Sequence, residues 1–109
     1  MGEDDRRLEI RGVNYELDDE LKDHTARRLR FALGRFADRV GRVTVHLSDV
    51  NGPRGGVDKR CRIAGDLVPR GVAMVEGSDH DPFALVARAA KRVGQSVRRT
   101  LERRRRVFV

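Results

Sequence analysis

Apolar and polar residues alternate in four short stretches of the chain, and each alternation predicts a β-strand with one buried face. In one of them Val43 and Val45 share a face, while Thr44 and His46 lie on the other. The four expected strands are Arg6–Arg11, Arg42–Ser48, Lys59–Ala64 and Gly71–Glu76. Turns or loops are expected at Gly12–Asn14, at Asn51–Gly56 and near Pro69–Arg70, where turn-forming residues gather.

Two further stretches have apolar residues at helical spacing. Asp18 is the expected N-cap of the first helix, which should fray near Asp38–Gly41, and Asp81 is the expected N-cap of the second, with Pro82 at its first position. Gly94 interrupts the second helix at a cost of about 1 kcal/mol relative to Ala. The apolar stripe of the first helix comprises Leu21, Thr25, Leu29, Ala32, Leu33 and Phe36; that of the second comprises Val86, Ala89, Ala90, Val93, Val97 and Leu101.

The expected order is therefore β-α-β-β-β-α. A right-handed crossover through the first helix makes the first two strands parallel, and the turns make the later strands antiparallel. Both helices must bury their stripes, which predicts an α+β fold of two layers, with a four-stranded mixed sheet and both helices on one face. A chain of 109 residues is expected to form one domain (1–109), with a core at about 6–102 and a basic tail, 103–109, that frays.

No residue pattern indicates catalysis, a metal or a cofactor. The single cysteine, Cys61, excludes an internal disulfide and a multi-cysteine zinc site. Cys61 and Ile63 are expected to face the core, whereas His46 faces outward, so a nucleophile–base pair is not expected. His24 and His80 lack metal-ligand spacing. We expect no enzyme activity, no cofactor and no small-molecule substrate.

The charge balance indicates a polyanionic partner. The net charge is +7 and the pI is about 10.9, values that fit nucleic acid or an anionic membrane surface. The charged start MGEDDRRLEI is unlike a signal peptide, and no apolar run approaches the roughly 20 residues that span a bilayer. We therefore expect a cytoplasmic protein without a membrane partner.

The position of the positive charge is more informative than its total. Along the second helix a basic stripe flanks the apolar one, and Glu102 is the only acid after Asp81. A merely solvated helix face is the simpler reading of any single Arg, but the scarcity of acids favours a phosphate-binding stripe. Membrane-surface binding needs a bulkier apolar face than these Val and Ala residues provide. The stripe comprises Arg88, Arg92, Gln95, Arg99 and Arg103, with Lys91, Arg98 and Arg105 beside it.

The first helix and one loop supply further candidates. Arg28 and Arg35 share a flank with Phe31, and we expect the Arg28 flank and the Arg92–Arg99 stripe of the second helix to form the two walls of one cleft. The loop Gly52–Gly55 matches the GxxG of KH domains, but it lies between strands rather than helices, so we take the match as chance. Arg54 could still touch RNA. The expected RNA-binding residues are Arg28, Arg35, Arg88, Arg92, Arg99 and Arg103, with Arg54 as a possible addition.

Several segments, in this order, resemble the bacterial ribosome hibernation-promoting factors, also called ribosome-associated inhibitors. The first strand and helix, LEIRGVNYELDDELKDHTARRLRFALGRFADRV, are similar to the opening of that family, VTVHLSDV to its second strand, and EGSDHDPFALVARAAKRVGQSVRRTL to its closing segment. The resemblance covers residues 8 to 101. It implies a fold like double-stranded-RNA-binding domains. It also implies a non-catalytic translation silencer that binds rRNA of the small ribosomal subunit near the decoding centre, where mRNA and tRNA would otherwise lie.

By position, the resemblance carries RNA contacts to Arg28, Arg92 and Arg99. Gln95 stands where family members often have a basic residue, which puts that contact in doubt. The C-terminal dimerisation domain of longer members has no counterpart in this sequence, so we expect a monomeric short form. Two alternatives remain: a general RNA-binding module or RNA chaperone without a ribosomal site, and an interaction module for an acidic protein partner.

Overall fold

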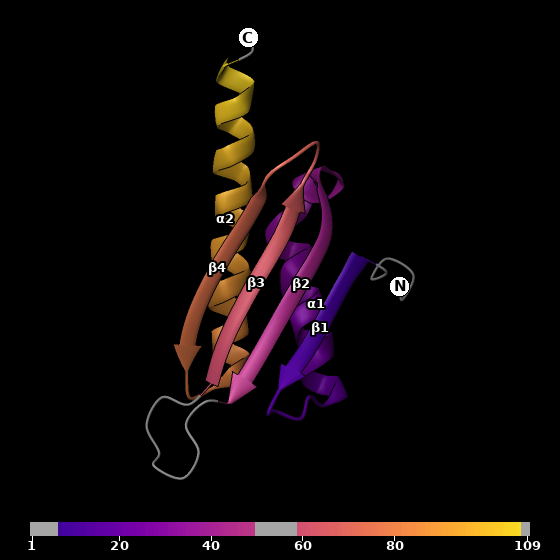
Figure 1. Cartoon of the computed structure of the whole chain (residues 1–109), viewed down its shortest axis with the longest axis vertical. Helices are drawn as coiled ribbons and strands as arrows, with labels where there is room; N and C mark the ends of the chain where they lie inside the picture. Colours follow the sequence, from indigo (N-terminus) through magenta and orange to yellow (C-terminus); the bar gives the residue numbers. More distant parts are fainter. Residues whose placement is uncertain (1–6, 50–58, 108–109) are drawn as a thin grey trace.

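The computed structural model describes residues 7–49 and 59–107, which form the expected β-α-β-β-β-α order with one extra short helix (Figure 1). The strands are β1 (Leu8–Val13), β2 (Val40–Asp49), β3 (Lys59–Leu67) and β4 (Val72–Asp79). The helices are α1 (Asp19–Leu33), the 3₁₀ helix η2 (Gly34–Arg39) and α2 (Pro82–Val107). The loop that contains Gly52–Gly55 and Arg54 lies outside the described residues.

The four strands form one mixed sheet in the order β1-β2-β3-β4. β1 pairs in parallel with β2, with Ile10 opposite Val45. β2–β3 and β3–β4 are antiparallel, with Val45 opposite Ile63 and Ile63 opposite Val75. The predicted α+β class, strand directions and mixed sheet are confirmed.

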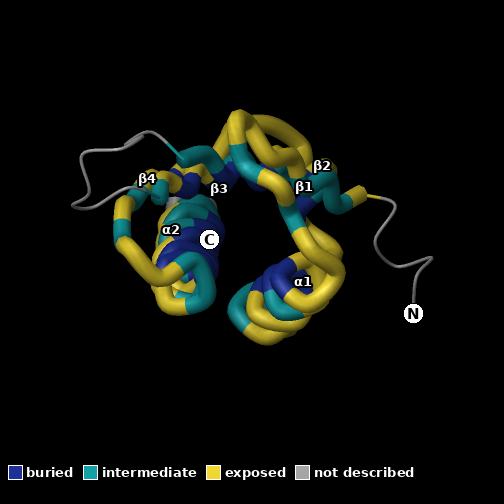
Figure 2. The backbone as a smooth tube through the Cα atoms, turned by 90° about the horizontal axis from the view of Figure 1, so that it is seen from below, coloured by how far each residue is buried: buried dark blue, intermediate teal, exposed yellow. Residues whose placement is uncertain are grey.

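Both helices cover the same face of the sheet and the other face is open, as Figure 2 shows. The alternation along the strands produces this arrangement, because inward residues such as Val45, Leu47 and Ile63 are completely buried. All six residues predicted for the stripe of α2 are buried, and Leu85, which the pattern did not single out, joins them. The helix layer therefore lies opposite the open face that carries Thr44 and His46.

The first helix ends earlier than predicted. Gly34 adopts a positive φ of 51° as C-cap, and its backbone N–H donates to the carbonyl of Arg30. A residue without a Cβ takes this conformation at little cost, so the α-helix stops there and one 3₁₀ segment, η2, continues to Arg39. Phe36, predicted for the stripe of the α-helix, lies on η2 and packs against the edge of the core.

The second helix ends later than predicted. Residues 103–107, which were expected to fray, continue α2 to Val107. Leu101 is buried, and Arg104 donates from Nη2 to the backbone carbonyl of Arg70 at 2.6 Å. This contact ties the last turns of α2 to the β3–β4 turn, although the helix itself projects past the sheet (Figure 1). β3 is also longer than predicted, since it pairs with β2 as far as Leu67.

Candidate nucleic-acid interface

Both predicted N-caps are formed, and they fix where each helix begins. The Asp18 carboxylate accepts from the backbone N–H of Leu21 at 2.8 Å. The Asp81 carboxylate accepts from the N–H of Phe83 at 3.0 Å. A capped start sets the rotation of each helix about its axis, and thereby the direction in which its basic residues point.

Two arginines of the basic stripe are bound to β4. Arg92 donates from Nη1 to the backbone carbonyl of Glu76 at 2.7 Å. One turn earlier, Arg88 forms an ion pair with Asp79 at 3.0 Å and donates to the carbonyl of Ser78 at 3.2 Å. This flank of α2 therefore faces the outer strand of the sheet.

The opposite flank of α2 faces α1. Gly94 lies against the backbone of Ala32, where an added Cβ would come within 2.6 Å of the Ala32 carbonyl oxygen. At the start of α2, the carbonyl of Phe83 lies 3.1 Å from Nε2 of His24, and the two rings meet edge to face. Arg28 lies one turn from both His24 and Ala32, so it is on the flank of α1 that faces α2.

The predicted cleft between Arg28 and the Arg92–Arg99 stripe is therefore wrong. Residues two positions apart on a helix point in nearly opposite directions. Since Gly94 touches α1, Arg92 must point away from α1, and its hydrogen bond to β4 shows that it does. Arg99, seven positions after Arg92, follows the same side of the helix. The cations on the Gly94 side of α2 are instead Lys91 and Arg98, three positions before and four after Gly94, and both are exposed.

The outer surface of the helix layer nevertheless carries the positive charge. Arg99 and Arg103 are exposed, and neither has a hydrogen bond or ion pair within the described residues. The only acid of α2 is Glu102. We define the basic face of α2 as Arg88, Arg92, Arg99 and Arg103, the four predicted stripe arginines.

The open face of the sheet differs in charge balance. Several of its cations stand beside acids: Arg62 pairs with Glu76 at 3.0 Å, and Arg11 donates to Glu9 at 2.6 Å. Arg42, on the same face, lies 3.9 Å from Glu9. Unbalanced positive charge is thus concentrated on the helix layer, where a polyanion would be attracted.

Arg35, the other predicted residue outside α2, is also placed away from that stripe. Its guanidinium lies 5.1 Å from the ring centre of Phe36, over η2. Phe31, on α1, is 86% exposed. Arg35 therefore belongs to a second basic region, formed by η2, the β3–β4 turn and the end of α2.

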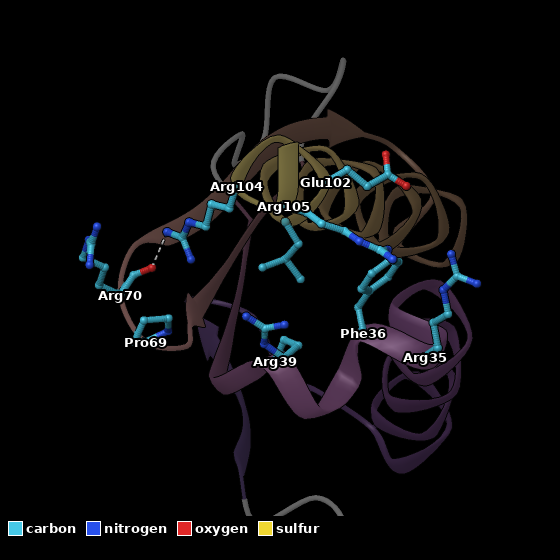
Figure 3. A pocket seen from close by; sticks show the side chains of 9 residues that line it. Arg35, Phe36, Arg39, Pro69, Arg70, Glu102, Arg104 and Arg105 are labelled. Atoms are coloured by element: carbon cyan, nitrogen blue, oxygen red, sulfur yellow. Dashed lines mark hydrogen bonds between the residues drawn. The ribbon is translucent and has the colours of Figure 1, made fainter. Parts of the chain in front are cut away.

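Near the C-terminal end of α2, this second region deepens into a cleft of about 790 Å³ that sequence reasoning missed (Figure 3). η2 contributes Arg35, Phe36 and Arg39, the β3–β4 turn contributes Pro69 and Arg70, and α2 contributes Leu101, Glu102, Arg104 and Arg105. No sequence spacing relates Arg39, Arg70 and Arg105. Their meeting depends on the 3₁₀ turn and on the continuation of α2 to Val107.

Cys61 and His46 lie on opposite faces of the sheet, as predicted. Cys61 is 1% exposed, and burial raises the pKa of its thiol to about 12. Its register partner on β2 is Leu47, whereas His46 stands opposite Arg62 on the open face. The thiol is thus protonated and shielded, which makes it a packing group.

Other chemistry finds no support in residues 7–49 and 59–107. Within these ranges no three His, Cys, Asp or Glu side chains are grouped to hold a metal ion. Among the same residues, no helix is both long and apolar enough to cross a membrane.

Among the acids that the structure describes, Asp79 is the one that forms an ion pair with the basic face, through Arg88. Its pKa is lowered, first by the hydrogen bond from the backbone N–H of Asp81 and next by the Arg88 side chain. The carboxylate therefore stays ionised and neutralises part of the charge of Arg88. The positive charges of Arg99 and Arg103 are not neutralised by any ion pair within the described residues.

Comparison with known proteins gives a consistent result. Residues 8–105 match the family model described as sigma 54 modulation protein / S30EA ribosomal protein. The fold is similar to the crystal structure of the Thermus thermophilus Protein Y N-terminal domain, with 32% identity and a TM-score of 0.67 over 85% of this chain and 94% of that one. It is also similar to a ribosomal subunit interface protein from Coxiella burnetii, with 10% identity and a TM-score of 0.74 over 87% of this chain and 97% of that one. No curated protein sequence matches.

Proposed function

This chain belongs to the sigma 54 modulation protein / S30EA ribosomal protein family, and on that premise we propose that it is a non-catalytic, ribosome-binding silencer of translation. It would bind rRNA of the small subunit near the decoding centre and keep mRNA and tRNA out. One similar structure, that from Coxiella burnetii, is named a ribosomal subunit interface protein.

The observation that carries the RNA-binding part is the unequal charge of the two layers. On the open sheet face, arginines pair with Glu9 and Glu76. On α2, a 26-residue helix whose only acid is Glu102, Arg99 and Arg103 are exposed without a partner among the described residues. Phosphates bound there would replace water and counterions without first breaking an internal contact.

The internal contacts of Arg88 and Arg92 set a division of roles within the basic face. Both guanidinium groups are held against β4, so their positions are fixed before RNA arrives. Each still has N–H groups free for phosphate, since a guanidinium carries five donors. Arg99 and Arg103 supply charge that is not compensated within the described protein. RNA would therefore lie along the outer side of α2 and not between two helix walls.

The test is binding to purified small ribosomal subunits, measured by co-sedimentation at several salt concentrations. Arg99→Glu combined with Arg103→Glu should weaken binding well over tenfold, since each charge-assisted contact contributes about 1.5–3 kcal/mol. The slope of log affinity against log salt should become shallower by roughly one to two units. Because neither arginine has an internal partner in the described residues, lost binding would not reflect lost folding.

The matched control reverses the same charge on the opposite layer. Arg42 and Arg60 are exposed residues of the open sheet face, and among the described residues Arg42 has only a long, exposed contact with Glu9 at 3.9 Å. Replacing both with Glu changes the net charge by the same amount. This control should keep most of the affinity. Equal loss in both double variants would show that net charge alone drives binding and would refute the assignment to α2. Equal affinity for any RNA of similar length would instead support a general RNA-binding module, and binding only to acidic proteins would support an interaction module.

A further inference from the structure

The cleft between η2, the β3–β4 turn and the end of α2 has a composition unlike that of the basic face. Five arginines and one glutamate line it, a surplus of four positive charges. Arg39, Arg70 and Arg105 form no ion pair within the described residues. Such a concentration of like charge repels itself unless anions enter, and a concave wall of low polarity strengthens the field inside.

The arginines do not lie on one flat surface. Figure 3 shows Arg39 on the η2 side of the cleft, Arg104 extending from α2 toward Arg70, and Arg105 extending from α2 toward Phe36 and Arg35. An anion in this cleft can be contacted from two opposite sides. That geometry suits a compact group with several oxygens, such as linked phosphates, better than one isolated phosphodiester of an extended backbone.

Arg104 gives a second indication. Its Nη2 donates to the carbonyl of Arg70 at 2.6 Å, but its Nη1 is shielded from solvent and has no hydrogen-bond partner among the described residues. An unsatisfied, solvent-shielded N–H of a charged group is unfavourable. A nearby polyanion would stabilise this guanidinium, and a small change of its side-chain torsions would bring Nη1 into contact with ligand oxygens.

The other lining residues are Glu102 and three apolar residues. Phe36 projects into the space from η2, and Leu101 and Pro69 form further apolar wall (Figure 3). Arg35 lies over the Phe36 ring, as noted above. The cleft volume of about 790 Å³ is in the range of small-molecule sites. A ligand that matches both halves has clustered phosphates at one end and a flat, weakly polar ring at the other.

We propose that this cleft is a binding site for a nucleoside di- or triphosphate. The phosphates would lie between Arg39 and Arg104, and the base would contact Phe36 and the neighbouring Arg105 guanidinium. The site is separate from the basic face of α2, because none of its nine lining residues belongs to Arg88, Arg92, Arg99 or Arg103. It would let a small metabolite bind the free protein independently of RNA.

The primary experiment is calorimetric titration of the whole protein with ADP, AMP and pyrophosphate in buffer without divalent metal. ADP should bind at one molecule per chain. AMP should bind at least fivefold more weakly, because it lacks the second phosphate, and pyrophosphate should also bind more weakly, because it lacks the base. Absence of saturable ADP binding, or equal affinity for ADP and AMP, would overturn the proposal.

Variants then locate the site. Arg39→Glu with Arg105→Glu should lower ADP affinity at least tenfold, while Arg99→Glu with Arg103→Glu, which has the same net charge, should leave it within about threefold. Phe36→Leu should lower the affinity for ADP but not the affinity for pyrophosphate. Because Phe36 also packs against the core, its thermal unfolding is measured in parallel, and the pyrophosphate affinity reports whether the cleft is intact. Equal ADP loss in the two double variants would overturn the assignment.

A ribosome-binding measurement on the same variants distinguishes failure of the nucleotide-site proposal from failure of the proposed function. The Arg39/Arg105 double variant should lose most of its affinity for ADP but retain most of its affinity for small ribosomal subunits. If that variant instead loses ribosome binding and the wild-type protein never binds ADP, the cleft is part of the RNA-binding surface and the nucleotide proposal is wrong. A loss of ribosome binding confined to the Arg99/Arg103 variant leaves both proposals supported.

Discussion

Gly94 of α2 lies so close to Ala32 of α1 that a Cβ on the glycine would be 2.6 Å from the alanine carbonyl oxygen. The obstacle is backbone, which cannot move aside as the end of a flexible side chain can. The two helices can approach this closely only because position 94 has no side chain. A residue that weakens helix formation thus determines the packing of the helix layer.

Gly94→Ala is the direct test of this contact. Helix propensity alone predicts a gain of about 1 kcal/mol. We expect a loss instead, by about 1–3 kcal/mol in the free energy of unfolding, because the added methyl group must separate the helices. Urea denaturation measures the change. Gln95→Ala, at the half-buried neighbouring position, should alter stability by no more than about 0.5 kcal/mol. A stabilised Gly94→Ala protein would contradict the close approach.

Because Cys61 is a buried packing residue, we expect the free energy of unfolding to fall at alkaline pH. Burial raises the pKa of this thiol to about 12 in the folded protein, above the ordinary thiol value of 9.0, so the folded state disfavours the thiolate. The stability from the neutral thiol is complete below pH 9 and is lost between pH 9 and about 12, at up to about 1.4 kcal/mol per pH unit. Cys61→Ala should remove this dependence, as shown by urea unfolding of both proteins from pH 8 to 10.5.

The same variant tests whether the thiol has any part in binding. Cys61→Ala or Cys61→Val should change stability by roughly 1 kcal/mol near neutral pH, and small-subunit affinity should stay within a few-fold. In the wild-type protein the thiol should react slowly with a thiol reagent until the protein unfolds. Abolished ribosome binding by a folded Cys61→Ala protein would assign the thiol a function.

Asp79 should limit the affinity of the basic face for RNA. Asp79→Asn keeps the shape and can still accept from the Asp81 backbone N–H, but it removes the negative charge beside Arg88. Small-subunit affinity should rise a few-fold at low salt, and the gain should shrink as salt increases. The comparison is Glu76→Gln, whose side chain pairs with Arg62 on the open face and should have no such effect. Equal gains in both variants would make the effect one of net charge.

The last turns of α2 should depend on Arg104. Arg104→Gln shortens the side chain that reaches the Arg70 carbonyl. We expect faster amide hydrogen exchange at 102–106, with unchanged exchange at buried positions such as Val93 and Val97. Exchange at 102–106 that is already as fast in the wild-type protein as in an unfolded peptide would show that the tail frays after all.

Inhibition of translation should be stoichiometric. If the protein silences ribosomes by occupying a site, inhibition of a cell-free reaction should saturate near one molecule per ribosome and should reverse when the protein is removed. Inhibition at far lower amounts would indicate an enzyme that modifies the ribosome or RNA. The Arg99/Arg103 double variant should shift the saturation point to higher concentration in parallel with its weaker binding.

The sequence by itself determined the element order, the strand faces and the starts of both helices. These follow from local chemistry: Asp18 and Asp81 cap their helices through their own side chains, and period-two alternation places Cys61 inward and His46 outward. The basic stripe of α2 was also visible, because helical periodicity fixes which residues share a side.

The tertiary structure alone decided what each side of α2 faces. Periodicity groups Arg92 with Arg99 but does not say whether they meet α1 or β4, since that depends on the rotation at which the apolar stripe seats on the sheet. The absent Cβ of Gly94 brings α1 to one side, and the hydrogen bond from Arg92 to Glu76 marks the other. The cleft of Arg39, Arg70 and Arg105 joins residues far apart in the chain. The cleft depends on the end of α1 at Gly34. It also depends on the hydrogen bond from Arg104 to Arg70, which joins the last turns of α2 to the β3–β4 turn.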